Sequence, residues 1–499
     1  MKLKQIALLV AGFTVSAAAF AAPVTIAQIE AARVAGQLDQ AWISGATAPT
    51  RTVYEGWVGS GAGVGCDLTT NTIFTSQSSA IPTGATATAT VPGTLGNYLA
   101  YACTRAGKVS VLYHTLDGGS LNAYAPHTVG TKLARLKYVG SPSANPCVSV
   151  GNYVDPTNAE NNAAVFKSCT QVGANTPAAG PNPTFNASNQ TLVNADSNAP
   201  SLPVGGFSDV EAALFAAAIG GGNVSSKGTE GQANIGQVFG VVVSTPLYRA
   251  LQTAQGLADI NATTYDPAVA PNITSQQYVS IIAQGGAYQT DWSPIIPGST
   301  KRIIVARRVD TSGTQASSNA FFLKSPCASA LSGSLIPAKA SDSALPLGTG
   351  FEVFEGSGTG NVKTRLSQAT TAGDYAIGVI SAENDWRADT TNNTYRFIKV
   401  DGIHPEAGDT VNARTAAVNG NYPFHMEVRN FVANTATGFG AAIVPQITAA
   451  LSAPPAAACA VLPRGLTLNP LGGSACAVGV QVMKSTVLGN NCSPYQLTQ

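Results

Sequence analysis

Runs of apolar residues alternate along this chain with segments in which apolar residues recur at helical spacing. These runs predict strands at residues 41–46, 108–115, 237–245, 301–309 and 376–381, and those at 237–245 and 301–309 are typical of buried strands. The segments with helical spacing predict helices at residues 25–40, 47–58, 207–219, 274–285 and 360–370. Strands that alternate with helices are typical of an α/β fold whose sheets are mostly parallel.

Two stretches lack both patterns. Residues 141–205 are rich in Asn, Pro, Ala, Ser and Thr and contain Cys147 and Cys169, so we expect a disulfide-tied surface insertion outside the core. The tail after about Pro445 is rich in Ala, Pro and Gly and carries three cysteines. We expect this tail to wrap over the surface and to be tied by disulfides.

The first 21 residues have the features of a secretory signal peptide. Lys2 and Lys4 give a positive start, residues 6–20 form an uncharged apolar run, and an Ala-Phe-Ala cleavage site ends at residue 21. The alternative is a membrane anchor, for which the apolar run is short. We therefore expect the signal peptide to be removed and the protein to be periplasmic or secreted, without a membrane anchor.

The cysteines indicate structural disulfides. The chain has 8 of them, and an even number in an exported protein is typical of a disulfide-stabilised fold. Proximity in sequence favours the pairs Cys66–Cys103 and Cys147–Cys169. The pairing of the others stays open, namely Cys327, Cys459, Cys476 and Cys492. The histidines are far apart in sequence and no C-x-x-C motif occurs, so we expect no metal and no cofactor.

Charge and length narrow the class of protein further. The chain of 499 residues carries 27 basic and 26 acidic residues, scattered along it, for a net charge of +1. This distribution offers no basic patch for nucleic acid or for an anionic membrane surface. A hydrophobic content of 44% indicates a globular protein, and a chain of this length exceeds what one compact core usually holds. Two lobes are therefore expected.

Several expected strands end in the same kind of corner, in which small hydroxyl residues and glycine precede a helix. The corners lie at residues 44–50, 118–120, 206–209 and 310–314. Such a corner directs free backbone N–H groups and the positive end of a helix dipole beyond the strand. In open α/β sheets ligands bind outside the carboxyl ends of the strands, so convergent corners of this kind predict an anion site.

Two charged residues in these corners indicate which anion the site would bind. Arg308 would add charge-assisted hydrogen bonds to the ligand. An ionised Asp209 only accepts hydrogen bonds, so it favours an anion that carries a proton. Phosphate carries such a proton near neutral pH and sulfate does not, which predicts that the site binds phosphate and rejects sulfate.

The order of these motifs resembles that of the phosphate-binding proteins of ABC transporters, within the type II periplasmic binding protein superfamily. "SGATAPTRTVYEGW" resembles the family's first signature, "GGFSDVEAAL" its Gly-x-Ser-Asp turn, and "RVDTSGT" its Arg-x-Asp-x-Ser-Gly-Thr motif. Residues 273–295 resemble the segment before the arginine strand. Residues 356–383 resemble the later glycine turn, helix and strand, with Val379 where the family usually has tyrosine. Together the matches cover most of residues 40–425.

The resemblance implies a role for each corner. It implies that Arg308 clamps the anion, that Asp209 accepts the proton of phosphate, and that Asp310 orients Arg308 without touching the ligand. It also implies that hydroxyl or backbone N–H groups of other residues donate to the anion, namely those of Thr47, Ser120, Ser312, Gly313 and Thr314. The family has Gly-Ser-Gly where this chain has Gly-Gly-Ser-Leu around Ser120.

The resemblance also implies a hinged fold whose two lobes close on the ligand. Lobe one would hold residues 22–240 with the insertion 141–205, lobe two would hold 241–420, and 421–499 would return to lobe one and form the cysteine-rich tail. The hinge would consist of two crossing segments, at 240–245 and 422–431. Such a protein would be a monomer without catalytic residues that delivers inorganic phosphate to an ABC transporter permease.

Two alternatives remain for the function. A secreted surface or interaction protein could keep the same fold and use residues 141–205 and the tail to contact other proteins. A secreted phosphoesterase could use the same anion site. No G-x-S-x-G motif, H-E-x-x-H motif or nucleophile–base pair supports catalysis in this sequence.

Overall fold

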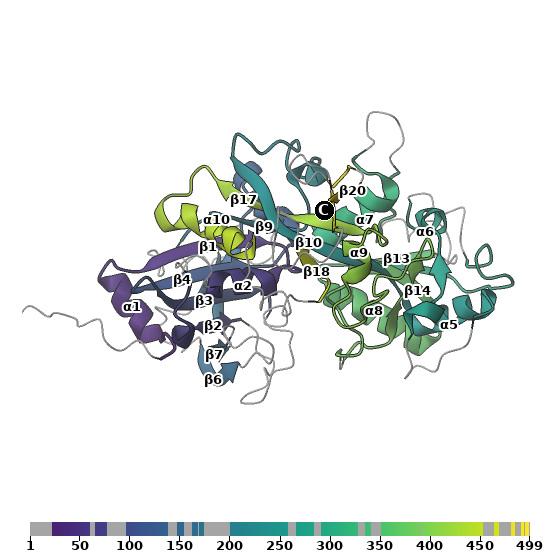
Figure 1. Cartoon of the computed structure of the whole chain (residues 1–499), viewed down its shortest axis with the longest axis horizontal. Helices are drawn as coiled ribbons and strands as arrows, with labels where there is room; N and C mark the ends of the chain where they lie inside the picture. The colour runs from purple at the N-terminus through teal and green to yellow at the C-terminus, as the bar shows by residue number, and fades with distance from the viewer. Residues whose placement is uncertain are drawn as a thin grey trace, which may run out of the picture.

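A large mixed sheet passes through the molecule and carries the elements that build the site (Figure 1). The structure is a computed structural model of the chain. It describes residues 22–59, 65–76, 96–137, 147–153, 162–167, 169–173, 200–257, 266–283, 291–327, 335–340, 351–389, 391–452, 464–468, 481–484, 491–493 and 495–498. The predicted signal peptide lies outside the described residues.

The strands of the main sheet are hydrogen-bonded in the order β13, β12, β14, β10, β17, β9, β1, β4, β3, β2, β7 and β6. Their bounds are β1 (Asp39–Gly45), β2 (Thr72–Thr75), β3 (Tyr98–Arg105), β4 (Lys108–Thr115), β6 (Val148–Tyr153), β7 (Ala163–Lys167), β9 (Gly205–Ser208), β10 (Gly228–Ser244), β12 (Ile303–Arg308), β13 (Phe351–Gly356), β14 (Tyr375–Ser381) and β17 (His425–Ala433). Two shorter strands, β15 (Tyr395–Phe397) and β18 (Leu466–Leu468), pair with β10 outside this order.

The long strand β10 and its antiparallel partner β17 connect the two ends of the sheet. β10 pairs with β17 along much of its length and then continues beside β14, at the end where β12 and β13 lie. β17 pairs on its other side with β9, at the end that contains β1, β4 and β3. The expected hinge segments, 240–245 and 422–431, overlap these two strands. The hinge itself and the lobe boundaries at residues 240 and 421 stay predictions.

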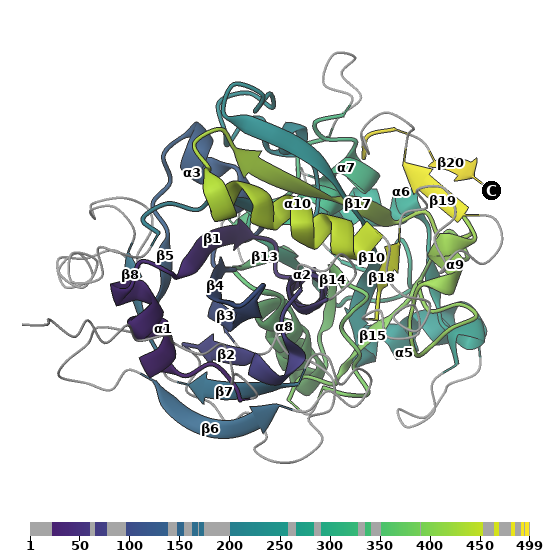
Figure 2. The ribbon, with the colours of Figure 1, turned by 60° about the vertical axis from the view of Figure 1, so that its left-hand side comes forward.

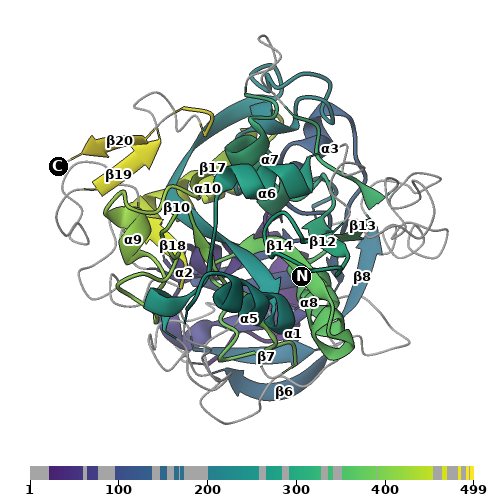
Figure 3. The ribbon, with the colours of Figure 1, turned by 90° about the vertical axis from the view of Figure 1, so that its right-hand side faces the viewer.

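Helices cover both faces of the sheet at each end. Their bounds are α1 (Ile26–Val34), α2 (Thr50–Val58), α5 (Thr245–Ala254), α6 (Ser275–Ile282), α7 (Gly313–Leu323), α8 (Thr359–Ala372) and α10 (Gly438–Ser452), with the single turns α3 (Ala125–Thr128) and α9 (Thr415–Val418). α10 packs against α2 and against β1, β10 and β17 (Figure 2). α5, α6, α7 and α8 surround β12 and β14 at the other end (Figure 3).

Strand alternation places α7 and α8 against opposite faces of β12. Ile303 and Val305 belong to the apolar cluster that contains the buried face of α7. Ile304 and Ala306 belong to a second cluster with the buried residues of α8. Successive side chains of a strand point to opposite faces, so a strand covered on both sides reads as a continuous apolar run. This explains why the sequence pattern located β12 correctly, together with β4, β14 and the second half of β10.

The expected α/β class is confirmed, but the sheet is mixed and not mostly parallel. β1 runs parallel to β4 and β9, and β12 runs parallel to β13 and β14. β10 runs antiparallel to β14 and β17, and β3 runs antiparallel to β2 and β4. The alternation of strands and helices indicated the class, whereas short connections such as that between β3 and β4 form hairpins, which are antiparallel.

The predicted helix at 207–219 is wrong. This segment forms the strand β9 and then only a short 3-10 helix, η4 (Ala212–Phe215). Phe207 pairs with Gly45 of β1 on one side and with Asn430 of β17 on the other. Hydrogen bonding to two neighbouring strands outweighs the helical spacing of the apolar residues, because local propensity is a weak preference that tertiary contacts override.

The expectation that residues 141–205 lie outside the core is also wrong in part. β7 pairs in parallel with β2, and β6 extends the same edge of the main sheet. Ala163 and Val165 are buried on one face of β7, in the alternation typical of a strand that is covered on one side. A second segment, β8 (Thr170–Gly173), pairs with β5 (Ala134–Lys137). Residues 174–199 lie outside the described residues.

The disulfides bear out the pairing that sequence proximity favoured. Cys66 is bonded to Cys103, and Cys147 is bonded to Cys169. Cys327 is bonded to Cys492, across a sequence separation of 165 residues, which confirms that a disulfide ties the tail. Cys459 and Cys476 lie outside the described residues. In the part of the chain that the structure describes, helices are too short or too polar to span a bilayer.

We predict that Gly206→Ala lowers the free energy of unfolding by about 3 kcal/mol. A methyl group at this position would lie 1.7 Å from the Ser44 carbonyl oxygen, where β9 approaches β1. Gly360→Ala is the matched control, because its methyl group would meet no atom within 4 Å in α8, and we expect it to be about 0.5 kcal/mol more stable than wild type. Urea unfolding monitored by circular dichroism measures both. A Gly206→Ala variant as stable as wild type would contradict the close approach of these strands.

Candidate anion site

Three of the predicted corners meet at one edge of the main sheet. β1 lies between β4 and β9 and is parallel to both. At the end of β1, Ser44 Oγ donates to the Asn122 carbonyl oxygen at 2.8 Å, and the N–H of Ala46, just after the strand, donates to the Phe207 carbonyl oxygen at 2.8 Å. These contacts bring the segments that follow β1, β4 and β9 together at the carboxyl ends of the strands, where ligands bind in α/β sheets.

Ser120 and Asp209 are in direct contact at this edge. Ser120 begins the 3-10 helix η2 (Ser120–Ala123), and its hydroxyl donates to Asp209 Oδ2 at 3.0 Å. The Asp209 N–H lies 3.4 Å from the same hydroxyl oxygen, to which it donates. Both side chains are buried. The structure thus brings together two of the residues that the resemblance singled out, from segments 89 positions apart in sequence.

The fourth corner, at the start of α7, packs onto this pair. A methyl group built on Gly313 would lie 2.3 Å from Ser120 Oγ and 2.4 Å from Asp209 Oδ2. Nearby, the Leu121 N–H donates to the Thr311 carbonyl oxygen at 3.1 Å. Glycine at position 313 allows this approach, because it has no side chain to separate the two backbones.

The N-terminus of α7 adds hydrogen-bond donors to the site. Ser312 is the residue that precedes the helix, Gly313 is its first residue, and Thr314 follows. The side chains of Ser312 and Thr314 are buried. The first N–H groups of a helix have no intrahelical partner and carry the positive end of the dipole, so this corner favours a negative charge.

Arg308 is the last residue of β12 and is held in place by the first residue of α8 and by the segment before this helix. Its Nη1 donates to Thr359 Oγ1 at 3.0 Å, and its Nη2 donates to the Ser357 carbonyl oxygen at 2.8 Å. Its backbone N–H donates to Gln315 Oε1 at 3.2 Å. The side chain is buried. These contacts fix the guanidinium group without neutralising its charge, because each acceptor is an uncharged oxygen.

Two buried polar atoms of the site have no hydrogen-bond partner among the residues that the structure describes. They are Asp209 Oδ1 and Arg308 Nε. Buried polar groups in proteins are almost always hydrogen-bonded, and each exception calls for an explanation. One of these atoms is an acceptor and the other a donor, on side chains of opposite charge, so a ligand with both an acidic proton and negative oxygens could satisfy both.

Burial also changes the acidity of both groups. It raises the pKa of Asp209 to about 6, against the opposing effects of the Ser120 hydrogen bond and the Arg308 charge. It lowers the pKa of Arg308 to about 10, against the attraction of Asp209 and Glu383. Near neutral pH, Asp209 is therefore mostly ionised and Arg308 is fully charged. The site contains a buried acid and a buried base that interact through space.

Glu383 is an ionisable residue at this site that the sequence motifs did not indicate. It follows β14, and it accepts a hydrogen bond from Ser381 Oγ at 3.1 Å. Although the residue as a whole is partly exposed, burial of its carboxyl group and the charge of Asp209 raise its pKa to about 8. Glu383 is therefore mostly protonated near neutral pH and does not repel an anion. Its position just beyond the expected strand at 376–381 could have indicated Glu383 as a site residue, because β14 ends at the same sheet edge as β12.

The expectation that Asp310 orients Arg308 is corrected by the structure. Asp310 forms ion pairs with Arg307 and with Lys339 instead. Arg307 and Arg308 are neighbours on β12 and point to opposite faces, as the alternation of side chains along a strand requires. Arg308 lies on the face covered by α8, where it contacts Thr359, whereas Asp310 lies with Arg307.

Thr47 lies at the same sheet edge, but its role stays a prediction. It follows β1, and its carbonyl oxygen accepts hydrogen bonds from the N–H and the hydroxyl of Thr50 at 3.2 and 2.6 Å. Its side chain is partly exposed. The described contacts do not join its hydroxyl to Ser120, Asp209 or Arg308.

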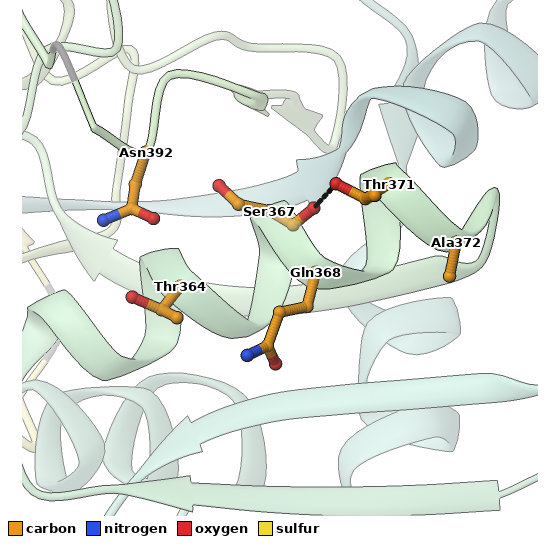
Figure 4. A pocket seen from close by; sticks show the side chains of 6 residues that line it. All are labelled: Thr364, Ser367, Gln368, Thr371, Ala372 and Asn392. Carbon is orange, nitrogen blue, oxygen red and sulfur yellow. Dashed lines mark hydrogen bonds between the residues drawn. The ribbon is translucent and has the colours of Figure 1, made fainter.

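A surface hollow of about 400 Å³ lies elsewhere, beside α8 (Figure 4). It is lined by uncharged side chains, and the Thr371 hydroxyl donates to the Ser367 carbonyl oxygen within it at 3.1 Å. None of its lining residues belongs to the anion site. Since no charged side chain lines it, this hollow offers an anion nothing comparable to Arg308 and the N-terminus of α7. Within the described ranges, no group of three or more His, Cys, Asp or Glu side chains is placed to hold a metal ion.

Comparisons with known proteins give structural similarities of low score. No family model matches the chain, and no curated protein matches it. A crystal structure assigned as a phosphate ABC transporter substrate-binding protein with bound phosphate, from Clostridium perfringens, is 11% identical and covers 86% of this chain and 99% of its own, with a TM-score of 0.35. An ABC-type phosphate transport receptor from Vibrio cholerae is 15% identical and covers 44% of this chain and 66% of its own, with a TM-score of 0.25.

A third similar structure, of a possible phosphate binding protein from Planctomyces limnophilus, is 12% identical and covers 46% of this chain and 63% of its own, with a TM-score of 0.24. All three TM-scores lie below the range in which a shared fold can be argued. These similarities therefore assign no role to the residues of this chain.

We predict that a carboxyl NMR titration gives Asp209 a pKa of about 6 and that Arg308→Met raises this pKa further. The positive charge of Arg308 stabilises the ionised carboxylate, so its removal favours the protonated form. Arg302→Met is the matched control, because Arg302 forms ion pairs with Glu352 and Asp374 outside the site and should leave the pKa of Asp209 unchanged. An identical pKa in the Arg308→Met variant and in wild type would show that the two charges do not interact.

Proposed function

We propose that this protein binds inorganic phosphate, without catalysis, at the site formed by Ser120, Asp209, Arg308 and the N-terminus of α7. The observation that carries the proposal is the pair of buried polar atoms without a protein partner, Asp209 Oδ1 and Arg308 Nε. An oxyanion that still carries a proton would satisfy both, since it can donate to the carboxylate and accept from the guanidinium.

Each part of the site would recognise a different feature of the anion. Arg308, the Ser312 and Thr314 hydroxyls and the first N–H groups of α7 would donate to the negative oxygens. Asp209 would accept the proton. Sulfate has no proton near neutral pH, so its oxygens would face the Asp209 carboxylate with two acceptors opposed, at a cost of about 1–3 kcal/mol or more. Asp209 would thus set the preference for phosphate over sulfate.

The resemblance of the sequence motifs supports a wider role, which is part of the proposal. We place the protein among two-lobed solute-binding proteins of the type II periplasmic class, exported to the periplasm or beyond and acting as a monomer. The lobes would meet along β10 and β17, with residues 22–240 and 421–499 in one and 241–420 in the other. Ser120 and Asp209 would come from the first lobe and Arg308 from the second, so that closure and binding are coupled. An ABC transporter permease would receive the phosphate.

We predict that Arg308→Met weakens phosphate binding by roughly 3 kcal/mol, because it removes the buried cation of the site. Asp209→Asn should weaken phosphate binding less and strengthen sulfate binding, since the amide can donate to an oxygen that carries no proton. Isothermal titration calorimetry with each anion measures these affinities. Asp266→Asn, at a surface position that caps a short 3-10 helix, is the control for loss of a carboxylate and should bind both anions like wild type.

Two outcomes of these titrations would contradict the proposal. Equal affinity of the wild-type protein for phosphate and sulfate would remove the role given to Asp209. Unchanged phosphate affinity in the Arg308→Met variant would exclude this site as the place of binding.

We also predict that the preference for phosphate shrinks as the pH falls through the pKa of Asp209, about 6. Above this pKa the carboxylate is ionised and repels an anion without a proton. Below it the protonated carboxyl group can donate to sulfate, so sulfate affinity should rise relative to phosphate affinity. Competition titrations across this range at fixed ionic strength test the effect, and Asp209→Asn should remove the part of the pH dependence that comes from this carboxyl group. A preference that grows with acidification would have the wrong sign.

A further inference from the structure

The end of the tail makes buried contacts with the segment that carries Asp209. The Asn491 N–H donates to Glu211 Oε1 at 2.9 Å, and Asn491 Nδ2 donates to Glu211 Oε2 at 2.6 Å. Glu211 lies two residues after Asp209. Asn491 Oδ1 also accepts from the Glu427 N–H of β17 at 2.8 Å, and Asn491 Nδ2 lies 3.2 Å from the Glu427 carbonyl oxygen. One side chain of the tail is therefore fully hydrogen-bonded to this part of the sheet.

The next residue of the tail is covalently attached to the other side of the site. Cys492 forms a disulfide with Cys327. Cys327 lies shortly after α7, the helix whose first residues pack onto Ser120 and Asp209. Two consecutive tail residues thus connect the segment of Asp209 with the helix that closes over it. We call Glu211, Asn491, Cys492 and Cys327 the latch.

The exposed fraction differs along the latch, and this difference decides which of its bonds a reductant in solution can reach. Glu211 and Asn491 are 7% and 4% exposed, so their hydrogen bonds are shielded from water. Cys492 is exposed and Cys327 is partly exposed, so a reductant in solution can reach this disulfide. The other two disulfides of the described residues are buried, with each cysteine at most 5% exposed. Mild reduction should therefore act on the latch first.

The latch lies beside the contact between α7 and the segment of Asp209. α7 touches the segment of Asp209 through Gly313, and the Leu121 N–H donates to the Thr311 carbonyl oxygen at 3.1 Å. α7 also packs against η4, within one apolar cluster that contains residues of both. A covalent link beside this contact opposes the separation of α7 from Asp209, because separation would have to stretch the Asn491 hydrogen bonds as well.

We propose that the latch holds the two halves of the anion site together, so that exchange of the anion is slow while the Cys327–Cys492 disulfide is intact. The inference rests on the proposed function for its ligand, phosphate, but the mechanical role of the latch does not depend on it. Reduction by a dithiol such as dithiothreitol would break the S–S bond to two thiols and oxidise the dithiol to its cyclic disulfide. α7 could then move away from Asp209, and the site would open more often.

The test compares variants that remove a disulfide from different places. Cys327→Ser combined with Cys492→Ser removes the latch disulfide, and Asn491→Ala removes the hydrogen-bonded half of the latch. Cys66→Ser combined with Cys103→Ser is the matched control, because it removes a disulfide at the end of the sheet away from α7. Phosphate release is measured by stopped-flow exchange with a phosphate sensor, and opening is measured by hydrogen exchange at the Leu121 amide without phosphate.

We expect the variant without the latch disulfide to release phosphate about tenfold faster than wild type and to lose protection at the Leu121 amide. Asn491→Ala should show the same two changes to a smaller degree, which keeps the proposal testable if the double variant fails to fold. Dithiothreitol should change the wild-type protein in the same direction. The control should keep both the wild-type release rate and the wild-type protection of Leu121, a result that a general loss of stability would not give.

The outcomes separate the latch from the proposed function. In one outcome, neither the wild type nor any variant binds phosphate, but the latch variants still lose protection at the Leu121 amide. This result supports the latch and rejects phosphate binding. If phosphate binds, but the latch variants match wild type in release rate and in Leu121 protection, the latch is overturned. Equal acceleration in the control and the latch variants would also overturn it.

Discussion

The site depends on two buried groups of opposite charge, the Asp209 carboxylate and the Arg308 guanidinium group, which interact with each other while both keep their charge. Asp209 and Arg308 are each 2% exposed. Burial raises the pKa of Asp209 and lowers the pKa of Arg308, and both shifts favour the uncharged form. Such charges are costly unless they are paired or hydrogen-bonded. The surrounding fold offsets part of this cost with neutral partners: Ser120 for the acid, and Thr359 with the Ser357 carbonyl group for the base. One polar atom of each group, Asp209 Oδ1 and Arg308 Nε, is left without a hydrogen-bond partner among the described residues.

The architecture explains how residues so far apart in sequence reach one place. β1, β4 and β9 end at one sheet edge, so the segments that follow them lie together. β10 and β17 join this end of the sheet to β14 and β12, and the end of β12 delivers Arg308 and the start of α7. The contact between Gly313 and the Ser120–Asp209 pair completes the site. Small residues at the corners are needed because a larger side chain would separate these backbones.

Two parts of the chain that lack strong local patterns contribute strands and buried contacts to the fold. β6 and β7 extend the sheet from a segment whose composition indicated a surface insertion, and the tail provides Asn491 and Cys492 beside the anion site. Neither contribution follows from local composition. A strand in a polar segment needs only a few apolar residues on its covered face, such as Ala163 and Val165, and a tail residue can be buried by partners that lie far away in sequence.

Local patterns in the sequence were enough to predict the α/β class, the main strands, two disulfides and the corners that carry Ser120, Asp209, Arg308 and Ser312. These follow from local chemistry, because periodicity, glycine corners and nearby cysteines act over a few to a few tens of residues. Contacts between distant segments make 205–208 a strand, pair Asp310 with Arg307, bring the charge of Glu383 near Asp209, and bond Cys492 to Cys327. These outcomes depend on which distant segments become neighbours in the sheet, and that is settled by the packing of the whole chain.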